Sequence, residues 1–316
     1  MKSLSTAVIT GVSTGIGNET ARTLAARGFH VFGSVRKPAD ADRLKAELGD
    51  QFTPLQFDLR DAQAIRTAAN LVRSSLRGQR LTALVNNASI ALGGPLALQP
   101  MDEIRQQFEV NVIGTIAVTQ AFIPLLGSDP SFQGNPGRIV NISSIGGHIG
   151  FPMMAAYAGT KFAIEGISES LRRELLLYGI DVIVIAPHST NTPFLDKAEA
   201  QDFSVYDHTP YQRPGKLVLD FSVRDGRKGY HPRQIAEVIH KAITVKKPRA
   251  RYSVVPKPLQ AWLLTNVFPT RLIDRMLAKQ FELVRIATTQ RPRSQGRVAE
   301  CAEPQIEDER QLEKVG

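Results

Sequence analysis

The chain has 316 residues, of which 42% are hydrophobic, and it carries a formal net charge of +9 at pH 7. This length and composition fit a globular protein with a substantial core. The only cysteine, Cys301, excludes an intramolecular disulfide, and neither a signal-length apolar run at the N-terminus nor a stretch of about 20 apolar residues is present. We therefore expect a cytoplasmic protein without a membrane span, and we predict no metal site.

The first predicted elements are a strand, a glycine-rich turn and a helix. Residues 6–9 form a short apolar run, and residues 18–27 place apolar side chains at helical spacing. Between them lies Thr10-Gly11-Val12-Ser13-Thr14-Gly15-Ile16-Gly17. Glycines let the backbone approach a phosphate closely, and the N–H groups at a helix N-terminus carry a partial positive charge. This order favours a dinucleotide-binding site over an ordinary glycine turn.

The end of the second predicted strand, residues 30–35, bears on the choice of dinucleotide. A site for NAD commonly places an acid here to bond the ribose 2′-hydroxyl, whereas a cation accommodates the 2′-phosphate of NADP. The acid position holds Val35, and Arg36 and Lys37 follow it, with Ser13 in the glycine turn. The sequence therefore predicts NADP(H) rather than NAD(H), with a solvated basic turn as the alternative interpretation.

Strand and helix patterns then alternate, which indicates a parallel sheet covered by helices on both faces. The further predicted strands are residues 52–57, 81–86, 138–143 and 181–186, and the helical patterns include 62–76, 102–126 and 155–178. We predict an α/β fold of the Rossmann type, a doubly wound parallel sheet of about seven strands. Such sheets bind ligands at the carboxyl ends of the strands, where the polar motifs of this chain fall.

Tyr157 and Lys161 lie four residues apart in the last helical pattern and would share one helix face. A free tyrosine has a pKa of about 10, and a nearby lysine cation favours the phenolate and lowers that pKa. Such a pair suits proton transfer to or from a carbonyl group. The spacing by itself is more typical of a solvated helix face. Its place after the fifth strand, thirteen residues beyond Ser144, favours catalysis.

Taken in order, these motifs resemble the single-domain branch of the short-chain dehydrogenase/reductase family over about residues 4–255. Asp58, followed by Leu59, matches the aspartate that meets adenine, and Asn86-Asn87-Ala88-Ser89 matches the Asn-Asn-Ala-Gly element. Asn111 matches the asparagine that holds a water in a proton relay, and Ser144 matches the catalytic serine. The resemblance implies that Asp58, Leu59, Asn87 and Ala88 bind the cofactor.

The resemblance also implies hydride transfer between a nicotinamide and a carbonyl compound. In reduction, Ser144 would hydrogen-bond the oxygen where negative charge develops, and Tyr157 would deliver the proton. Lys161 would hold the nicotinamide ribose and tune Tyr157, and Asn111 would connect the site to solvent through water. Ser143 is the rival for the serine role, but the thirteen-residue offset favours Ser144. A dinucleotide-binding regulator without turnover is the alternative function.

Three positions depart from the family's pattern. Ser89 stands where a glycine is usual, and Thr160 replaces the common serine before the lysine. The Pro-Gly element after the sixth strand reads Pro187-His188, which narrows the backbone conformations open to a loop that meets the nicotinamide. In that loop Pro187, Thr190 and Thr192 remain the predicted cofactor contacts. His188 is expected to be packed or solvent-facing rather than to meet the substrate.

Residues 192–229 take the place of the family's substrate loop and are rich in aromatic and turn residues. Apolar stretches at residues 93–96 and 149–154 would add walls beside the catalytic groups. We therefore expect a lipophilic ketone or alcohol as the small-molecule substrate. The run Val35-Arg36-Lys37-Pro38 is similar to the 17β-hydroxysteroid dehydrogenase and retinol dehydrogenase-like group, but similarity beside the cofactor says little about the substrate.

A C-terminal extension follows the predicted catalytic domain, residues 1–255. Residues 246–293 carry eleven Lys or Arg against two acids, whereas residues 294–316 carry three against six. Apolar residues recur at helical spacing over residues 256–290, beside a stripe of Arg271, Arg275 and Lys279. We favour helices packed over the catalytic domain, and peripheral contact with an anionic membrane is the alternative. Residues 291–316 are predicted to be disordered.

Two expectations concern macromolecular partners. The excess positive charge lies on one amphipathic segment without interleaved aromatic residues, so we predict no nucleic acid partner. The resemblance implies a homodimer or homotetramer that forms through the helices containing Asn111 and Tyr157.

Overall fold

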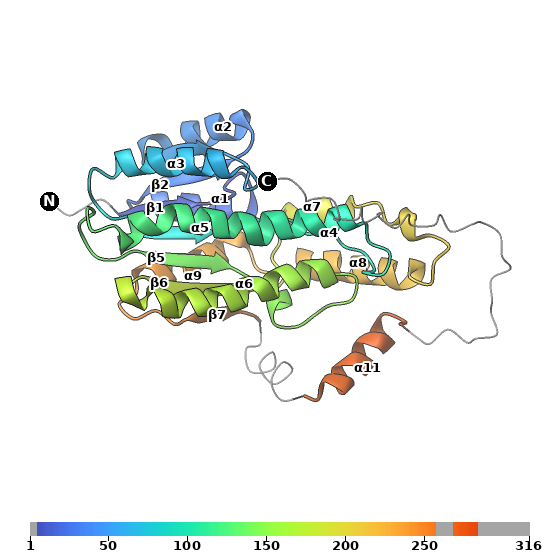
Figure 1. The fold of residues 1–316 in the computed structure, drawn as a ribbon. Coiled ribbons are helices and arrows are strands. Elements are labelled where there is room, and N and C mark those ends of the chain that lie inside the picture. Colours follow the sequence, from blue (N-terminus) through green and yellow to red (C-terminus); the bar gives the residue numbers. More distant parts are fainter. Residues whose placement is uncertain (1–4, 257–267, 284–316) are drawn as a thin grey trace, which may run out of the picture. The chain divides into compact units, whose positions relative to one another are not determined.

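The computed structural model describes residues 5–256 and 268–283, and it contains a seven-stranded parallel sheet (Figure 1). The strands lie in the order β3-β2-β1-β4-β5-β6-β7, so the chain order reverses between β1 and β4. Their bounds are β1 (Thr6–Ile9), β2 (His30–Val35), β3 (Phe52–Gln56), β4 (Ala83–Asn86), β5 (Arg138–Ile142), β6 (Asp181–Pro187) and β7 (Arg251–Val254). The predicted doubly wound sheet is confirmed, and its ligand-binding edge lies where β1 and β4 end.

Helices cover both faces of this sheet, as Figure 1 shows. On one face lie α1 (Gly15–Ala25), α2 (Pro38–Leu48) and α9 (Pro232–Thr244), and on the other lie α3 (Ala62–Ser75), α5 (Gly114–Ile123) and α6 (Ala155–Glu174). Alternate strand residues supply the two cores: Ala7 and Ile9 pack toward α1, whereas Val8 packs toward α3 and α5. Burial on both faces explains why the strands read as continuous apolar runs.

Two helices differ from their predicted bounds. The helix after the glycine turn begins at Gly15 rather than at residue 18. Glycines are poor helix formers, so the sequence pattern did not include them in the helix. The structure requires a glycine at residue 17, because a side chain there would collide with neighbouring atoms. The helix predicted over 102–126 is divided into α4 (Met101–Phe108), a π-helical turn (Glu109–Ile113) and α5, and a second π-helical turn (Pro124–Ser128) ends it. Such turns interrupt helices mostly at functional sites, and the first one carries Asn111.

By length and composition alone, the helical run Met101–Ser128 could cross a membrane, contrary to the expectation that no such stretch exists. Its side chains Val118, Phe122 and Leu126 are fully buried against the sheet in the core that α3 shares. We therefore interpret the run as a core helix, because a helix buried between a sheet and its neighbours needs the same apolar composition as a membrane span.

After β6 the chain leaves the sheet and forms α7 (Phe194–Glu199) and α8 (Gln212–Arg227), which lie beyond the carboxyl ends of the strands (Figure 1). A further helix, α11 (Thr270–Gln280), confirms a helical extension after β7. The rest of the predicted extension, residues 257–267 and 284–290, and the predicted disordered tail with Cys301 lie outside the described residues.

Candidate active site

The glycine turn presents the N-terminus of α1 without a cap. Gly11 and Gly15 have φ of 71° and 62°, a left-handed conformation that favours glycine. Among the described residues the N-cap residue Thr14 makes no side-chain capping bond, and the first turn of α1 contains no acid. The first-turn N–H groups of a helix lack partners within the helix, so this end fits an anionic phosphate.

Backbone packing requires Gly17. A Cβ atom at Gly17 would lie 2.2 Å from the carbonyl oxygen of Gly11 and 2.5 Å from Nδ2 of Asn87. Asn87 ties the turn to the end of β4, because its Nδ2 donates to the carbonyls of Thr10 and Gly11 over 2.9 and 3.1 Å. The backbone N–H groups of Asn87 and Ala88 in turn donate to Oγ1 of Thr10. The structure thus brings these five predicted cofactor residues together.

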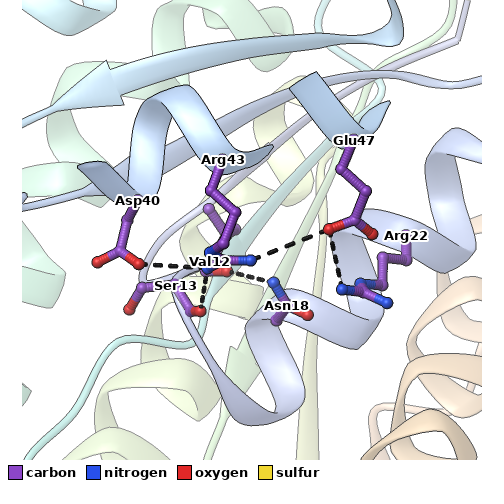
Figure 2. A network of polar contacts seen from close by, with 7 residues as sticks. All are labelled: Val12, Ser13, Asn18, Arg22, Asp40, Arg43 and Glu47. Atoms are coloured by element: carbon purple, nitrogen blue, oxygen red, sulfur yellow. Dashed lines mark hydrogen bonds and ion pairs between the residues drawn. The ribbon is translucent and has the colours of Figure 1, made fainter. Parts of the chain in front are cut away.

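Two residues that sequence reasoning missed also support the glycine turn. Ser34, buried in β2, accepts a hydrogen bond of 2.9 Å from the N–H of Gly11. Arg43 of α2 donates to the carbonyl of Ser13 over 2.8 Å and pairs with Asp40 (Figure 2). The i, i+3 spacing of Asp40 and Arg43 was visible in the sequence, but their proximity to the turn depends on how α2 packs beside α1.

The predicted adenosine-side residues meet where β2 and β3 end. The Arg36 side chain is 65% exposed, and its Nη1 lies 3.9 Å from the carboxylate of Asp58. Arg60, which sequence reasoning missed, donates to the same carboxylate through Nε and Nη2 over 2.9 and 3.0 Å. This hydrogen bonding, with a smaller charge effect of Arg36, lowers the pKa of Asp58. Leu59 is buried in the core beside Gly114.

Ser144 and Tyr157 come together from two elements. Ser144 follows β5 and caps a short turn, where its Oγ accepts a 3.1 Å hydrogen bond from the N–H of Gly146. Tyr157 lies in the first turn of α6. Burial raises the pKa of Tyr157 to about 12, and its hydrogen bond with Ser144 acts in the opposite direction. The phenol is therefore protonated at neutral pH. The rival Ser143 is buried, and its Oγ has no partner among the described residues.

Lys161 is only 3% exposed, and its Nζ donates to the carbonyl of Ile142 over 3.0 Å. Nζ lies 5.6 Å from the ring centroid of Tyr157. Burial lowers the pKa of Lys161 to about 8, and Glu165 partly opposes this shift. The expected lowering of the Tyr157 pKa by Lys161 is not found, because burial of the phenol dominates and the ammonium hydrogen-bonds the carbonyl of Ile142 instead.

Asn111 connects three parts of the site. Its side chain accepts from the N–H of Ile90 and donates to the carbonyl of the same residue, each over 2.8 Å. The amide also donates to Oγ1 of Thr160 over 3.1 Å, and that hydroxyl donates to the carbonyl of Tyr157 over 2.7 Å. Sequence reasoning noted Thr160 only as a mild departure. The structure shows it as the link between Asn111 and the helix that carries Tyr157, and the water relay stays a prediction.

We expect Thr160→Val to lower the free energy of unfolding by about 1–2 kcal/mol, because the isosteric side chain leaves a buried amide hydrogen of Asn111 without its acceptor. Urea denaturation measures this loss. Thr244→Val is the matched control: its hydroxyl makes an exposed bond to the carbonyl of His240 at the end of α9, which water can replace. Equal effects of the two substitutions would refute the assigned link.

The loop after β6 lies against both the glycine turn and α8. Thr192 lies 3.4 Å from where a Cβ of Gly15 would stand, and Thr190 Oγ1 donates to the carbonyl of His188 within the loop. His188 Nδ1 is 3.9 Å from the carboxylate of Asp225, to which Ser189 also donates. Pro187 is the last residue of β6 and pairs with Val254 of β7. The structure therefore places His188 beside an acid of α8, a neighbour that its sequence position did not indicate.

The predicted substrate loop contacts both Tyr157 and the segment after β4. The ring centroid of Phe194 lies 6.4 Å from that of Tyr157. Gln201 holds the loop on the segment after β4, because its amide both accepts from and donates to the backbone of Gly93 over 2.9 and 2.6 Å. Tyr206 is buried, and a Cβ at Gly94 would lie 2.4 Å from its hydroxyl. Phe194 thus gives the phenol an aromatic neighbour from this loop.

Comparison with known proteins agrees with this arrangement. Residues 5–202 match the family model described as short chain dehydrogenase. An NADPH-dependent 3-dehydrocapnine reductase from Ornithobacterium rhinotracheale is 36% identical over 87% of this chain and 97% of its own length. A 3-ketodihydrosphingosine reductase from Bacteroides thetaiotaomicron is 32% identical over 79% of this chain and 87% of its own length. A solved short chain dehydrogenase/reductase from Burkholderia phymatum, in complex with NAD, superimposes with a TM-score of 0.71 at 21% identity, covering 86% and 95% of the two chains.

Proposed function

Because this chain belongs to the short-chain dehydrogenase family and is therefore an NAD(P)-dependent oxidoreductase, we propose that it uses NADP(H) to reduce a lipophilic ketone to an alcohol or to catalyse the reverse. One observation carries the proposal. Ser144, which lowers the pKa of the Tyr157 phenol, lies with Tyr157 and buried Lys161 at the carboxyl edge of the sheet, where the glycine turn presents the N-terminus of α1. This edge is the ligand-binding edge of a doubly wound sheet.

Each of these residues has a role that its surroundings support. The bound nicotinamide supplies or accepts the hydride. Ser144 donates to the substrate oxygen, and Tyr157, whose pKa of about 12 keeps it protonated at neutral pH, acts as the acid in reduction. Lys161, with a pKa of about 8, is mostly charged at neutral pH. Two relatives named as reductases also support the reducing direction.

NADP(H) is favoured by the cations after β2. The carboxylate of Asp58 accepts two bonds from Arg60, so it leaves the exposed Arg36 side chain with a distant contact of 3.9 Å. A guanidinium of this kind can meet a 2′-phosphate. One relative is named as NADPH-dependent, whereas a solved protein of the same fold holds NAD, so the fold by itself does not select the cofactor.

Arg36→Ala is expected to raise the KM for NADPH by about 10- to 100-fold, because it removes a charge-assisted hydrogen bond to the 2′-phosphate. The KM for NADH should change little, since that cofactor lacks the phosphate. Initial rates with both cofactors measure the effect, and Arg66→Ala on the exposed side of α3 is the control. If the ratio of KM for NADPH to KM for NADH does not change, Arg36 does not bind the 2′-phosphate.

The proposed reaction is tested with a panel of lipophilic ketones and alcohols, including 3-ketodihydrosphingosine, and both cofactors. Nicotinamide absorbance reports turnover, and NADPH fluorescence reports binding. Turnover of at least one lipophilic ketone with NADPH is expected. Binding of NADPH without turnover across the panel would contradict the enzyme and favour the regulator.

We further propose that the protein is cytoplasmic and forms a homodimer or homotetramer. Phe108 and Phe162 are exposed, and Phe108 lies 3.4 Å from the Cβ position of Gly159 on α6, so the two aromatic residues share one face with the exposed Ile113 nearby. Exposed apolar patches of this kind support association between copies. Light scattering coupled to size-exclusion chromatography tests this, and a monomer at micromolar concentration would exclude it.

Peripheral membrane contact through α11 is a separate proposal. Phe268, Leu272 and Met276 are exposed at a spacing of four residues, and Arg271, Arg275 and Lys279 form the neighbouring stripe. An exposed apolar stripe flanked by cations suits the surface of an anionic bilayer. Liposome flotation at low salt tests it, and a protein that stays wholly in solution would rule it out.

A further inference from the structure

We propose that α11 closes the substrate site, with Phe281 as a residue that sets the size of substrate the enzyme accepts. The proposal rests on the proposed function, because it assumes that a ketone binds beside Ser144 and Tyr157. It concerns the contacts of Phe281 and Glu282 at the end of α11, which none of the roles above includes. Three observations carry it: the burial of Phe281, the segment on which it packs, and the ion pair that follows it.

Phe281, directly after α11, is 1% exposed and is among the largest fully buried side chains of the described structure. Its ring stands edge-on to the rings of Phe151 and Phe221, with centroids 5.2 and 5.5 Å away and interplanar angles of 74° in both cases. Phe151 and Phe221 stack on each other at 5.8 Å. Aromatic clusters of this geometry are favourable beyond the area they bury, so Phe281 is an anchor and not a peripheral contact.

The cluster lies on the segment that joins the two candidate catalytic residues. Phe151 and Met153 belong to the residues between Ser144 and Tyr157, and Met153 packs in the same apolar cluster as Phe281. The carbonyl of Met153 accepts a 2.7 Å hydrogen bond from the N–H of Gly94, which connects this segment to the wall that Gln201 and Tyr206 also contact. A change at Phe281 therefore reaches the apolar wall beside Tyr157 through direct packing.

The other partner in the cluster is α8. Val218, which is buried, and Phe221 pack in one cluster with Phe281, so α8, the segment 151–153 and the end of α11 all meet there. Arg213, in the first turn of α8, donates to the carboxylate of Glu282 over 2.8 Å, with a second contact through Nε. α11 thus contacts the outer helix of the substrate loop through one aromatic anchor and one ion pair.

The turn that ends α11 places Glu282 in a left-handed backbone conformation that usually holds glycine or asparagine. Glu282 has φ of 53°, and the N–H of Leu283 donates to the carbonyl of Ala278 over 2.9 Å. This is the helix-ending motif in which glycine or asparagine usually takes the left-handed position. A glutamate accepts that conformation at a cost, and its carboxylate is the group that meets Arg213. The strained turn therefore directs both Phe281 and Glu282 toward α8.

α11 also supplies its own control. Gln280 lies on the same helix, but it is exposed and takes part neither in the cluster nor in the apolar and basic stripes of α11. Truncating Phe281 opens space among Phe151, Phe221 and Val218, whereas truncating Gln280 opens none. A small ketone that reaches only Ser144 and Tyr157 should be insensitive to that space, whereas a long ketone that extends along the segment 151–153 should bind less tightly once Phe281 no longer supports that wall.

The test compares Phe281→Ala with Gln280→Ala in the full-length protein, using 3-ketodihydrosphingosine as the large ketone and cyclohexanone as the small one. We expect Phe281→Ala to raise KM for the large ketone by about ten-fold or more, because the wall formed by the segment 151–153 loses its buried aromatic support. KM for cyclohexanone and Kd for NADPH should stay within about two-fold, a change too small to reflect a lost contact. Equal losses for both ketones, or no loss for either, would overturn the proposal.

A second set of variants removes the concern that Phe281→Ala merely disturbs folding. Glu282→Arg should raise KM for the large ketone, and the added Arg213→Glu should restore it, because the exchanged charges can pair again. Glu282→Gly relaxes the backbone and removes the carboxylate, so it should raise KM despite the easier turn. Failure of the charge exchange to restore KM, together with a wild-type KM for Glu282→Gly, would show that this pair does not hold α8.

Hydrogen exchange separates failure of this inference from failure of the proposed function. If wild type reduces no ketone, the function is wrong, yet the packing of α11 on α8 can still be measured. Phe281→Ala should speed exchange of the amides of α8 by at least about three-fold, whereas Gln280→Ala should not, because local opening follows loss of buried contacts. Unchanged exchange in α8 for Phe281→Ala would overturn the inference by itself.

Discussion

Tyr157→Phe is expected to lower kcat for ketone reduction by about 10²- to 10⁴-fold, the usual contribution of a general acid. The substitution removes only the hydroxyl that hydrogen-bonds Ser144, and the ring keeps its packing beside Phe194. Binding of NADPH should therefore remain within about two-fold of wild type, because no contact of the ring is lost. Single-turnover kinetics and NADPH fluorescence titration measure the two quantities separately.

Tyr178→Phe is the matched control, because Tyr178 is exposed in the short turn that continues α6 and lies remote from Ser144 in the sequence. It should leave kcat unchanged. Full turnover by Tyr157→Phe would show that another group delivers the proton. Loss of NADPH binding together with turnover would show instead that the phenol supports the cofactor site rather than the chemical step.

Gly17→Ala is expected to abolish measurable binding of NADPH and to destabilise the protein by about 1–3 kcal/mol or more, the cost of overpacking a rigid site. The added Cβ would stand 2.2 Å from the carbonyl oxygen of Gly11, a backbone atom that cannot move without opening the turn. It would also meet Nδ2 of Asn87, which ties the turn to β4. Fluorescence titration and urea denaturation measure both effects.

Gly166→Ala provides the comparison, because no heavy atom lies within 4 Å of the Cβ it would add, and the residue lies inside α6. An alanine in a helix is favoured over glycine by about 0.5–1 kcal/mol, so this variant should be slightly more stable than wild type and bind NADPH normally. Normal NADPH binding by Gly17→Ala would contradict the assignment of the turn as the phosphate site.

The residues around the candidate site suggest that the substrate loop is attached to the rest of the protein at three places. Gln201 bonds the backbone of Gly93, Asp225 accepts from Ser189 in the loop after β6, and Arg213 pairs with Glu282. These contacts join α7 and α8 to the ends of β4, β6 and α11. Since all three involve side chains of the loop, single substitutions can loosen it without touching Tyr157 or the glycine turn.

Much of the fold was predictable because it depends on local patterns. Apolar runs bounded by turns predicted β1, β2 and β5 within a residue of their bounds, since a strand buried on both faces needs an uninterrupted apolar sequence. The Rossmann-type sheet followed from the alternation of these runs with helical patterns. The start of α1 and the interruption around Asn111 were missed, because tertiary contacts and not propensity decide them.

The candidate site likewise has residues that were predictable from the sequence and residues that were not. Glycine spacing, the offset between Ser144 and Tyr157, and the cations after β2 are visible in the sequence, because strand ends and helix faces place them predictably. Arg43, Thr160 and Asp225 were missed as partners of the site, because each meets a residue on another element. No local pattern encodes such a meeting.

By itself, the sequence determined the class of fold and the glycine turn, since these depend on residue type and short-range spacing, and its resemblance to the short-chain dehydrogenase/reductase family implied the candidate catalytic set. Only the tertiary structure decided that burial raises the pKa of Tyr157 rather than Lys161 lowering it, because desolvation depends on every neighbour that excludes water. It alone also decided that Phe281 packs on Phe221 of α8 and on Phe151 before Tyr157, since residues 60 and 130 positions apart meet only when the chain folds.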